Sequence, residues 1–494
     1  MSWAHASADR NLQERRRLVS VTGLPQRSFA VRYLTLFGGE TFSKVCVAAA
    51  FAFLAHVLSP ADYGIVELSL SITVFFVLGV ESGMGLYGAR IVAAHPERTP
   101  TLVAHVMVLR LLLGLPAFAL ILAASAHYRF AGLGILAVNG MAILLTPFLT
   151  QWVFQGLRQM QWVAIGTAAR NFTFVAIVLL VMRPGRDIRF VAVAELSGIA
   201  MLAMLSSVYL YGRLRIWPVW HDALAGARRL FRDVWFMGLS DFTWACLWYA
   251  PGLIVGWLGL GMERVAWVAS SVRIVISLHT FVFLYFFNML PNMAKELATD
   301  VAGWRDLIGR SIATSIWPGC LIALGGTLIA PMLMPLVYGP AYAAAVRPLQ
   351  IIVWMIPVAW FSGHFRFSLI AAGEQRWEFA ASGAAAIVTV TVSAVLAHAY
   401  GSAGAAAGLL AGGVANLVLA VAMSHRRIGP VPVLSSTAPA LLTTGVCLAV
   451  GLLAMPMTGT LAATTIACAL FVGVASRQDN DLVRLVRGFL KAGR

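Results

Sequence analysis

Long apolar stretches separated by short polar segments repeat along almost the whole chain. Each stretch has roughly the 20 residues that an α-helix needs to cross the hydrocarbon core of a bilayer. The pattern predicts an all-α polytopic membrane protein with about fourteen transmembrane helices. They are expected near residues 32–58, 64–82, 103–124, 131–155, 163–182, 190–211, 235–257, 265–290, 311–337, 348–371, 379–399, 403–424, 434–454 and 459–476.

The composition supports a membrane protein and excludes other classes. The chain has 494 residues, of which 60% are hydrophobic and only 11% charged, with a mean hydropathy of +0.83. A soluble globular domain carries close to a quarter charged residues, and disordered, collagen-like or disulfide-rich chains have other signatures. The five cysteines lie in apolar stretches without a CxxC pair, which argues against disulfides and a metal site.

The positive charge is distributed unevenly between alternate loops. The formal net charge is +16, an excess that would suggest nucleic acid in a soluble protein but not in this membrane-embedded chain. Of the 36 Lys and Arg residues, 24 lie in the set of loops that includes both termini and six in the opposite set. The positive-inside rule therefore predicts cytoplasmic termini, although Arg183, Arg186 and Arg189 run against it.

Two pairs of similar segments indicate an internal duplication. FGGETFSKVC (37–46) matches MGLSDFTWAC (237–246) at several offsets, and GLRQMQWVA (156–164) parallels GEQRWEFAA (373–381). Six-helix halves are a transporter architecture, with the substrate site between the halves. The predicted organisation is a basic cytoplasmic N-terminus (1–31), an N-lobe (32–211), a basic cytoplasmic linker (212–234), a C-lobe (235–427), two appended helices (428–476) and a basic amphipathic cytoplasmic tail (477–494).

Basic residues inside the predicted spans are candidates for binding an anionic substrate. A charged side chain at mid-membrane costs at least about 2.5 kcal/mol, so such residues usually face a wet cavity or a partner. The candidates for a cationic cavity are Arg273, Arg110, Lys44, Arg32, Arg170 and Arg366. For Arg32, Arg170 and Arg366, which lie near helix ends, snorkelling into the headgroups is the alternative.

Acidic residues inside the spans are candidates for charge balance or ion coupling. Glu40 precedes Lys44 by four residues, the favourable order for an ion pair on one helical face. Asp241 has no basic residue within one turn and is a candidate proton-coupling site. Glu81 and Glu195 are the other two candidates for charge balance or coupling, and Glu67 is a further acid inside a predicted span, to which no role is assigned. No cofactor is expected, and coupling to H⁺ or Na⁺ stays open.

Motifs of membrane or soluble enzymes are missing from the sequence. It contains no GxSxG, GxxxxGK[ST] or HExxH pattern, and no long extracytoplasmic loop that could carry catalytic carboxylates. We therefore expect a transporter rather than an enzyme.

Four segments resemble elements of the polysaccharide-transporter family, which flips lipid-linked oligosaccharides. They are VLSPADYGIVELSLSI (57–72), ESGMGLYGARIVA (81–93), FQGLRQMQWVAI (154–165) and YGPAYAAAVRPLQII (338–352), similar to "LGPxDYGxY", "DxGLxxxxxRxxA", "FQGxxxMxxxA" and "YGxxYxxAxxxLxIL". The family belongs to the MOP superfamily, which also contains lipid II flippases and multidrug and toxin extrusion proteins.

The resemblance implies a function in surface polysaccharide assembly. Members move an undecaprenyl-pyrophosphate-linked oligosaccharide across the bacterial cytoplasmic (inner) membrane by alternating access, for O-antigen, capsule or exopolysaccharide. The implied partners are the lipid-linked oligosaccharide, the bilayer and the polymerase of the same pathway. In related flippases a cationic cavity receives the pyrophosphate, and Arg273 corresponds in place to a basic residue of such cavities.

Other functions remain as alternatives at this stage. A multidrug exporter would favour an acidic, aromatic-lined cavity for cationic drugs. A lipid II flippase would share the fold, and a polysaccharide polymerase or ligase would need a large extracytoplasmic loop.

Overall fold

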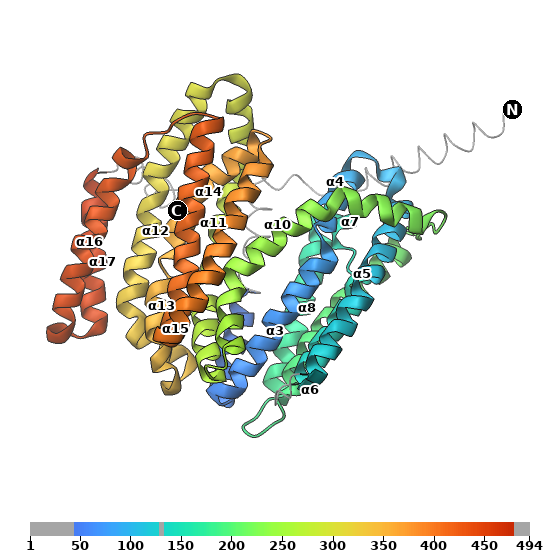
Figure 1. Ribbon diagram of the computed structural model, residues 1–494, viewed down its shortest axis with the longest axis horizontal. Helices are drawn as coiled ribbons and strands as arrows, with labels where there is room; N and C mark the ends of the chain where they lie inside the picture. The colour runs from blue at the N-terminus through green and yellow to red at the C-terminus, as the bar shows by residue number, and fades with distance from the viewer. Residues whose placement is uncertain (1–43, 128–132, 479–494) are drawn as a thin grey trace, which may run out of the picture.

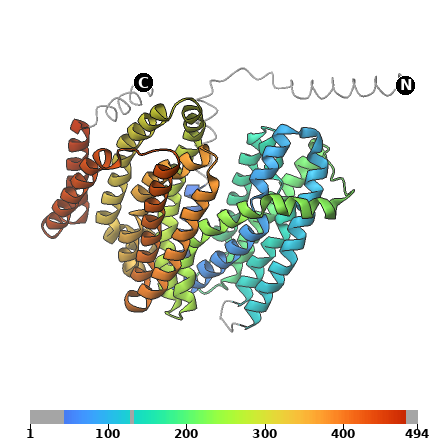
Figure 2. The same cartoon turned by 45° about the horizontal axis from the view of Figure 1, so that its top comes forward.

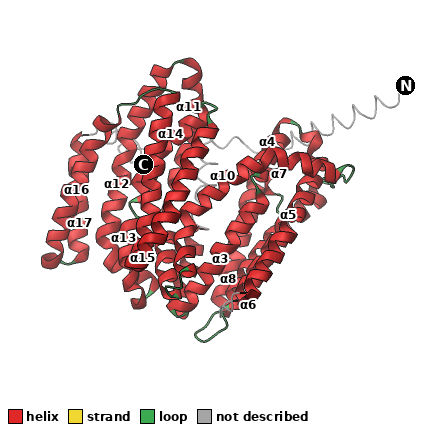
Figure 3. Ribbon diagram, viewed as in Figure 1, coloured by secondary structure: helices red, strands yellow, loops and turns green. Residues whose placement is uncertain are grey.

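The computed structural model describes residues 44–127 and 133–478, and every element within these ranges is helical (Figure 3). The first half contains the helix Lys44–Val57, α3 (Pro60–Glu81), α4 (Met84–Ala94), η1 (Pro96–Arg98), α5 (Thr99–His127), α6 (Leu133–Leu145), η2 (Thr146–Phe148), α7 (Gln151–Gly156), α8 (Met160–Val181), α9 (Arg189–Ser207) and η3 (Val208–Arg213). The second half contains α10 (Ala223–Trp257), α11 (Met262–Thr299), α12 (Val301–Tyr338), η4 (Pro340–Ala345), α13 (Val346–Ile352), α14 (Met355–Ala371), α15 (Gln375–Arg427), α16 (Val433–Thr458) and α17 (Thr460–Gln478).

The prediction of an all-helical multi-pass membrane protein is confirmed. Across the described ranges, 11 helical segments are long and apolar enough to cross a membrane. The 53-residue α15 contains a break at Gly401 (φ 57°, ψ −130°), so it consists of two consecutive helices. The helix Lys44–Val57 is short because the start of the predicted span 32–58 lies outside the described residues. The count of fourteen spans stays a prediction.

The helices form two groups with α10 running between them (Figures 1 and 2). We call α3–α9 the N-lobe, and α11–α15 with the second half of α10 the C-lobe. The first half of α10 packs on α5, and its second half packs on α15 and α3. At the outer edge of the C-lobe, α16 and α17 pack on α12.

The two lobes share a hydrophobic core at one end only. There, one core combines side chains of both lobes, including Val66 of α3, Val178 of α8 and Val268 of α11. Toward the other end, the N-lobe has its own core around Met84, and the C-lobe has a separate one around Phe286. We call the first the closed end and the second the separated end.

A close approach of α3 to α11 holds the closed end together. A Cβ atom on Gly64 would lie 1.9 Å from the carbonyl oxygen of Met262, so a larger residue there would clash with the α11 backbone. Helix α3 begins nearby at Pro60, which needs no N–H donor in the first turn. The Ser59 hydroxyl caps this helix by accepting a hydrogen bond of 3.1 Å from the Asp62 N–H. In the segment SPADYG (59–64), the serine and proline thus begin α3, and the glycine permits its contact with α11.

Candidate functional site

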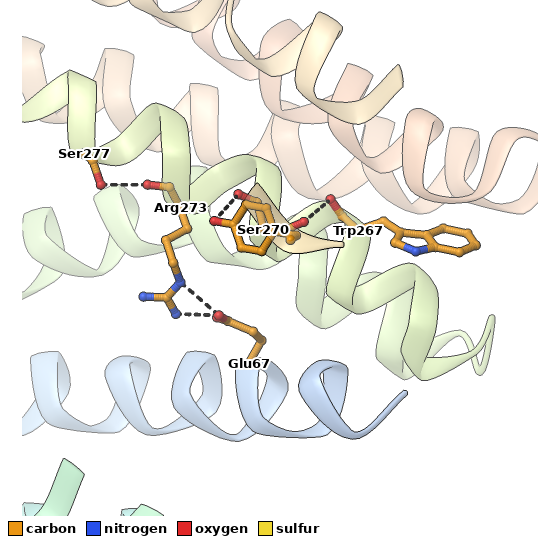
Figure 4. Close-up of polar contacts among 6 residues, drawn as sticks. Glu67, Trp267, Ser270, Arg273 and Ser277 are labelled. Carbon is orange, nitrogen blue, oxygen red and sulfur yellow. Dashed lines mark hydrogen bonds and ion pairs between the residues drawn. The ribbon is translucent and has the colours of Figure 1, made fainter. Parts of the chain in front are cut away.

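An ion pair between the two lobes lies beside this contact (Figure 4). Arg273 of α11 donates hydrogen bonds to Oε1 of Glu67 of α3 from Nε at 2.9 Å and from Nη2 at 2.5 Å. The side chains of Arg273 and Glu67 are 22% and 7% exposed. Helix α3 is the second helix of the first predicted six-helix half, and α11 is the second helix of the other half. The pair therefore joins the two lobes at the closed end.

Aromatic rings surround this ion pair. The Arg273 guanidinium carbon lies 3.3 Å from the ring centroid of Phe51, close enough for a cation–π contact. Tyr63 contacts Tyr338 and Tyr342 edge-on, with ring centroids 6.3 and 5.8 Å apart. The Tyr338 hydroxyl donates to the Ser270 carbonyl oxygen at 3.4 Å. Partial burial among these rings lowers the local polarity, which strengthens the electrostatic attraction within the pair.

Lys44 lies on the same side of α11 as Arg273. Its Nζ donates to the Thr280 hydroxyl at 3.3 Å. Thr280 and Arg273 are seven residues apart on α11, and Lys44 and Phe51 are seven residues apart on their helix. Because two helical turns separate the members of each pair, the helices run antiparallel, with Lys44 opposite Thr280 and Phe51 opposite Arg273. The structure thus brings two of the predicted basic residues, Lys44 and Arg273, to the contact between the helix Lys44–Val57 and α11.

Arg110 has a different environment within the N-lobe. It is 2% exposed and donates from Nη1 to the carbonyl oxygens of Thr146 and Leu149, at 2.7 and 2.9 Å. Its Nη2 lies 3.5 Å from Glu81. The guanidinium thereby donates to two carbonyl oxygens of the turn that follows the end of α6. The contacts of Arg110 are those of a residue that stabilises this turn.

Two further arginines also have glutamate partners inside single lobes. Arg170 of α8 contacts Glu195 of α9 at 2.5 Å, and Arg170 is 38% exposed. Arg366 of α14 donates to Glu378 of α15 at 2.9 and 2.6 Å, and Ser382 donates to the same carboxylate oxygen. Each pair links two neighbouring helices of one lobe. Their predicted role in substrate binding stays a prediction.

The predicted coupling acids Asp241 and Glu81 lie near the crossing of α3 and α10. A Cβ atom on Gly238 would be 2.6 Å from the Ser82 Cα, which defines the crossing point. Glu81 precedes Ser82, and Asp241 follows Gly238 by one turn and is half-buried. The predicted residues Arg32 and Glu40 lie outside the described residues.

No group of His, Cys, Asp and Glu side chains suited to a metal ion occurs within residues 44–127 and 133–478.

The sequence analysis noted Glu67 only as an acid inside a span, without a role, and did not select Phe51 or the three tyrosines. Spacing along one helix reveals only partners on that helix, whereas Glu67 and Arg273 are 206 positions apart. The motifs could have pointed to these residues, because Tyr63 and Glu67 lie in segment 57–72, and Tyr338 and Tyr342 lie in segment 338–352. The structure packs these two segments together.

The other two motif segments also pack against each other. A Cβ atom on Gly156 would lie 2.7 Å from the Ala89 carbonyl oxygen, and one on Gly88 would lie 2.5 Å from the Trp152 ring. Segment 81–93 therefore contacts the region around segment 154–165 at the separated end. The four motifs form one contact pair near each end of the molecule.

Comparisons with known proteins identify the family and the fold. A family model described as "Polysaccharide biosynthesis protein" matches residues 34–296. No curated protein matches the chain. Among solved structures, an inward-facing multidrug resistance MATE family transporter of the MOP superfamily is 14% identical, with a TM-score of 0.66 over 78% of this chain and 94% of that chain. The lipid II flippase MurJ in an inward closed conformation is 13% identical, with a TM-score of 0.69 over 91% and 100%. At these identities the likeness establishes a shared fold.

Proposed function

The chain belongs to the polysaccharide biosynthesis protein family, and on that premise we propose that it is a flippase for undecaprenyl-pyrophosphate-linked oligosaccharides. It would act in the bacterial cytoplasmic membrane, with both termini in the cytoplasm, and deliver repeat units for a surface polysaccharide. The pathway's polymerase would receive the product. The observation that carries this proposal is the interlobe pair of Arg273 and Glu67 at the closed end of a two-lobed membrane fold.

The chemistry of Arg273 fits the pyrophosphate group of such a lipid. A bare pyrophosphate in hydrocarbon would bear a prohibitive desolvation cost, which charge-assisted hydrogen bonds can offset. A guanidinium presents paired N–H donors to phosphate as it does to a carboxylate. We propose that the pyrophosphate replaces Glu67 as the partner of Arg273, and that Lys44 supplies a second positive charge two turns away. Arg110, Arg170 and Arg366 would stabilise the individual lobes.

The distribution of the apolar cores suggests how access alternates. The lobes share a core at the closed end and have separate cores at the other end. With the predicted topology, the separated end faces the cytoplasm, so the substrate head would enter there. When the pyrophosphate replaces Glu67 as the partner of Arg273, the ion pair between α3 and α11 would be lost and the closed end would open. Asp241 and Glu81, at the crossing of α3 and α10, are the proposed sites for a coupling H⁺ or Na⁺.

The test is the location of lipid-linked intermediates in a deletion strain of the source bacterium. We expect complete repeat units to accumulate on the cytoplasmic face, with loss of the surface polymer. The wild-type gene should restore export, and Arg273→Gln at equal protein abundance should not. Accumulation of lipid II would favour a lipid II flippase. An unchanged lipid-linked pool together with altered drug susceptibility would refute the proposal in favour of an exporter.

A further inference from the structure

A surface rich in arginine and aromatic residues lies outside the interlobe site, on the connection between the lobes. We call residues 213–235 the basic–aromatic segment. Its exposed large apolar side chains are Trp217, Val219, Trp220, Leu224, Phe231 and Trp235, whose exposed fractions range from 43% to 64%. Its five arginines, all exposed, are Arg213, Arg215, Arg228, Arg229 and Arg232. A cluster of exposed apolar and basic side chains in one ordered segment is typical of a surface that contacts an external partner.

The segment is fixed to the N-lobe on its inner side. The Val219 N–H donates to the Pro100 carbonyl oxygen at 3.1 Å, and the Tyr87 hydroxyl donates to Asp233 at 3.0 Å. Ala227 and Leu230 of α10 are buried in the same core as α5. The first half of α10 crosses the separated end of the N-lobe at an angle to α3 and α5 (Figures 1 and 2). Its outer face therefore has a defined orientation.

The outer face is amphipathic in the manner of an interfacial helix. Leu224, Arg228, Phe231 and Trp235 follow one another at helical spacings of four, three and four residues, so they form one stripe. Arginines at positions 229 and 232 stand beside it. Tryptophan and arginine are enriched where a protein meets lipid headgroups, with the ring among the upper acyl carbons and the cation at the phosphate level.

We propose that the basic–aromatic segment lies in the plane of the membrane surface and binds the headgroups of anionic phospholipids. Charge complementarity favours an anionic partner, because within the described part of the chain none of the five arginines has an ion-pair partner. The two acids of the segment contact other groups than these arginines: Asp222 lies 3.1 Å from His221, and Asp233 accepts a hydrogen bond from Tyr87. The surface lies in the predicted cytoplasmic linker, where anionic headgroups are available.

The experiment measures lipid binding by the full-length protein, purified in detergent and stripped of lipid. Dioleoylphosphatidylglycerol is titrated against dioleoylphosphatidylcholine, which has the same chains and no net charge. We expect wild type to prefer phosphatidylglycerol and the triple variant R228Q/R229Q/R232Q to lose that preference. Each basic residue near an anionic surface changes affinity about five-fold, so three should change it on the order of a hundred-fold.

Two matched variants separate this surface from general effects of charge and folding. R305Q/R310Q/R426Q removes the same charge from exposed C-lobe positions in other predicted cytoplasmic loops and should change the affinity less than two-fold. R228K/R229K/R232K keeps the charge and should restore most of the preference. Equal binding of the two lipids by wild type would overturn the proposal. So would an equal loss in the C-lobe variant, or binding of free glycerol 3-phosphate as tight as that of the lipid.

Discussion

Replacing Glu67 by glutamine tests whether the interlobe ion pair stabilises the closed end. The substitution keeps the shape of the side chain and leaves Arg273 without its counter-ion. Arg273 makes two hydrogen bonds to one carboxylate oxygen, and the side chains are only 22% and 7% exposed. We expect the free energy of unfolding to fall because a buried cation then lacks an anionic partner.

The size of the effect follows from burial. Removing one partner of a buried ion pair costs about 3–5 kcal/mol. We expect about 3 kcal/mol, the lower end of that range, because the glutamine oxygen still accepts a hydrogen bond and the contact with Phe51 remains. The double variant Glu67→Gln/Arg273→Gln should return to within about 1 kcal/mol of wild type, since no buried charge is left unpaired.

The control is Glu195→Gln, which breaks the pair with Arg170. That contact is also 2.5 Å long, but Arg170 is 38% exposed and both residues belong to the N-lobe. We expect a smaller loss than for Glu67→Gln, because the more exposed Arg170 near the end of its predicted span can reach the headgroups once its partner is removed. The measurement is unfolding by SDS titration in mixed micelles, followed by circular dichroism. A loss for Glu67→Gln no larger than for Glu195→Gln, or no recovery in the double variant, would refute the reasoning.

Three further predictions concern packing, structure and coupling. Gly64→Ala should destabilise the protein by about 1–3 kcal/mol in the same titration, because its Cβ would clash with the α11 backbone, whereas Gly79→Ala on the same helix meets open space. Arg110→Gln should lower protein abundance, measured by immunoblot, but leave polymer export per protein copy unchanged; a loss of export at equal abundance would contradict its structural role. Asp241→Asn should abolish any response of transport in proteoliposomes to an imposed H⁺ or Na⁺ gradient, and a retained response would exclude Asp241 as the coupling site.

The hydrophobic pattern alone was sufficient for the fold class. Runs of about 20 apolar residues have one stable conformation in lipid, because every backbone group must bond within its own helix. The helix boundaries were less predictable where polar residues extend a helix beyond the bilayer. Helix α10 begins at Ala223, inside the segment 212–234 predicted as a linker, because its first turns pack on α5 rather than lie free in solution.

The sequence was sufficient to select charged residues of the candidate site but not to predict their partners. The cost of a charge in lipid selects Arg273, Lys44 and Arg110 alike, and only the structure shows that they have different partners: Arg273 and Lys44 contact other helices of the closed end, whereas Arg110 contacts two backbone carbonyls and Glu81. Which acid pairs with which arginine depends on how distant helices pack. Glu67 and Glu378 became evident as partners only once α3 lay on α11 and α15 lay on α14.

The pairing of the motifs connects family membership with the proposed mechanism. Segments 57–72 and 338–352 meet through Tyr63, Tyr338 and Tyr342 at the closed end, where they surround the ion pair. The tyrosines come from α3 in one lobe and from α12 and η4 in the other, so any movement that separates the lobes must part these rings. Opening therefore costs both the ion pair and the ring contacts. In the proposed mechanism, a substrate pyrophosphate that replaced Glu67 as the partner of Arg273 would offset only the first of these costs, so the ring contacts would favour reclosure after the substrate leaves.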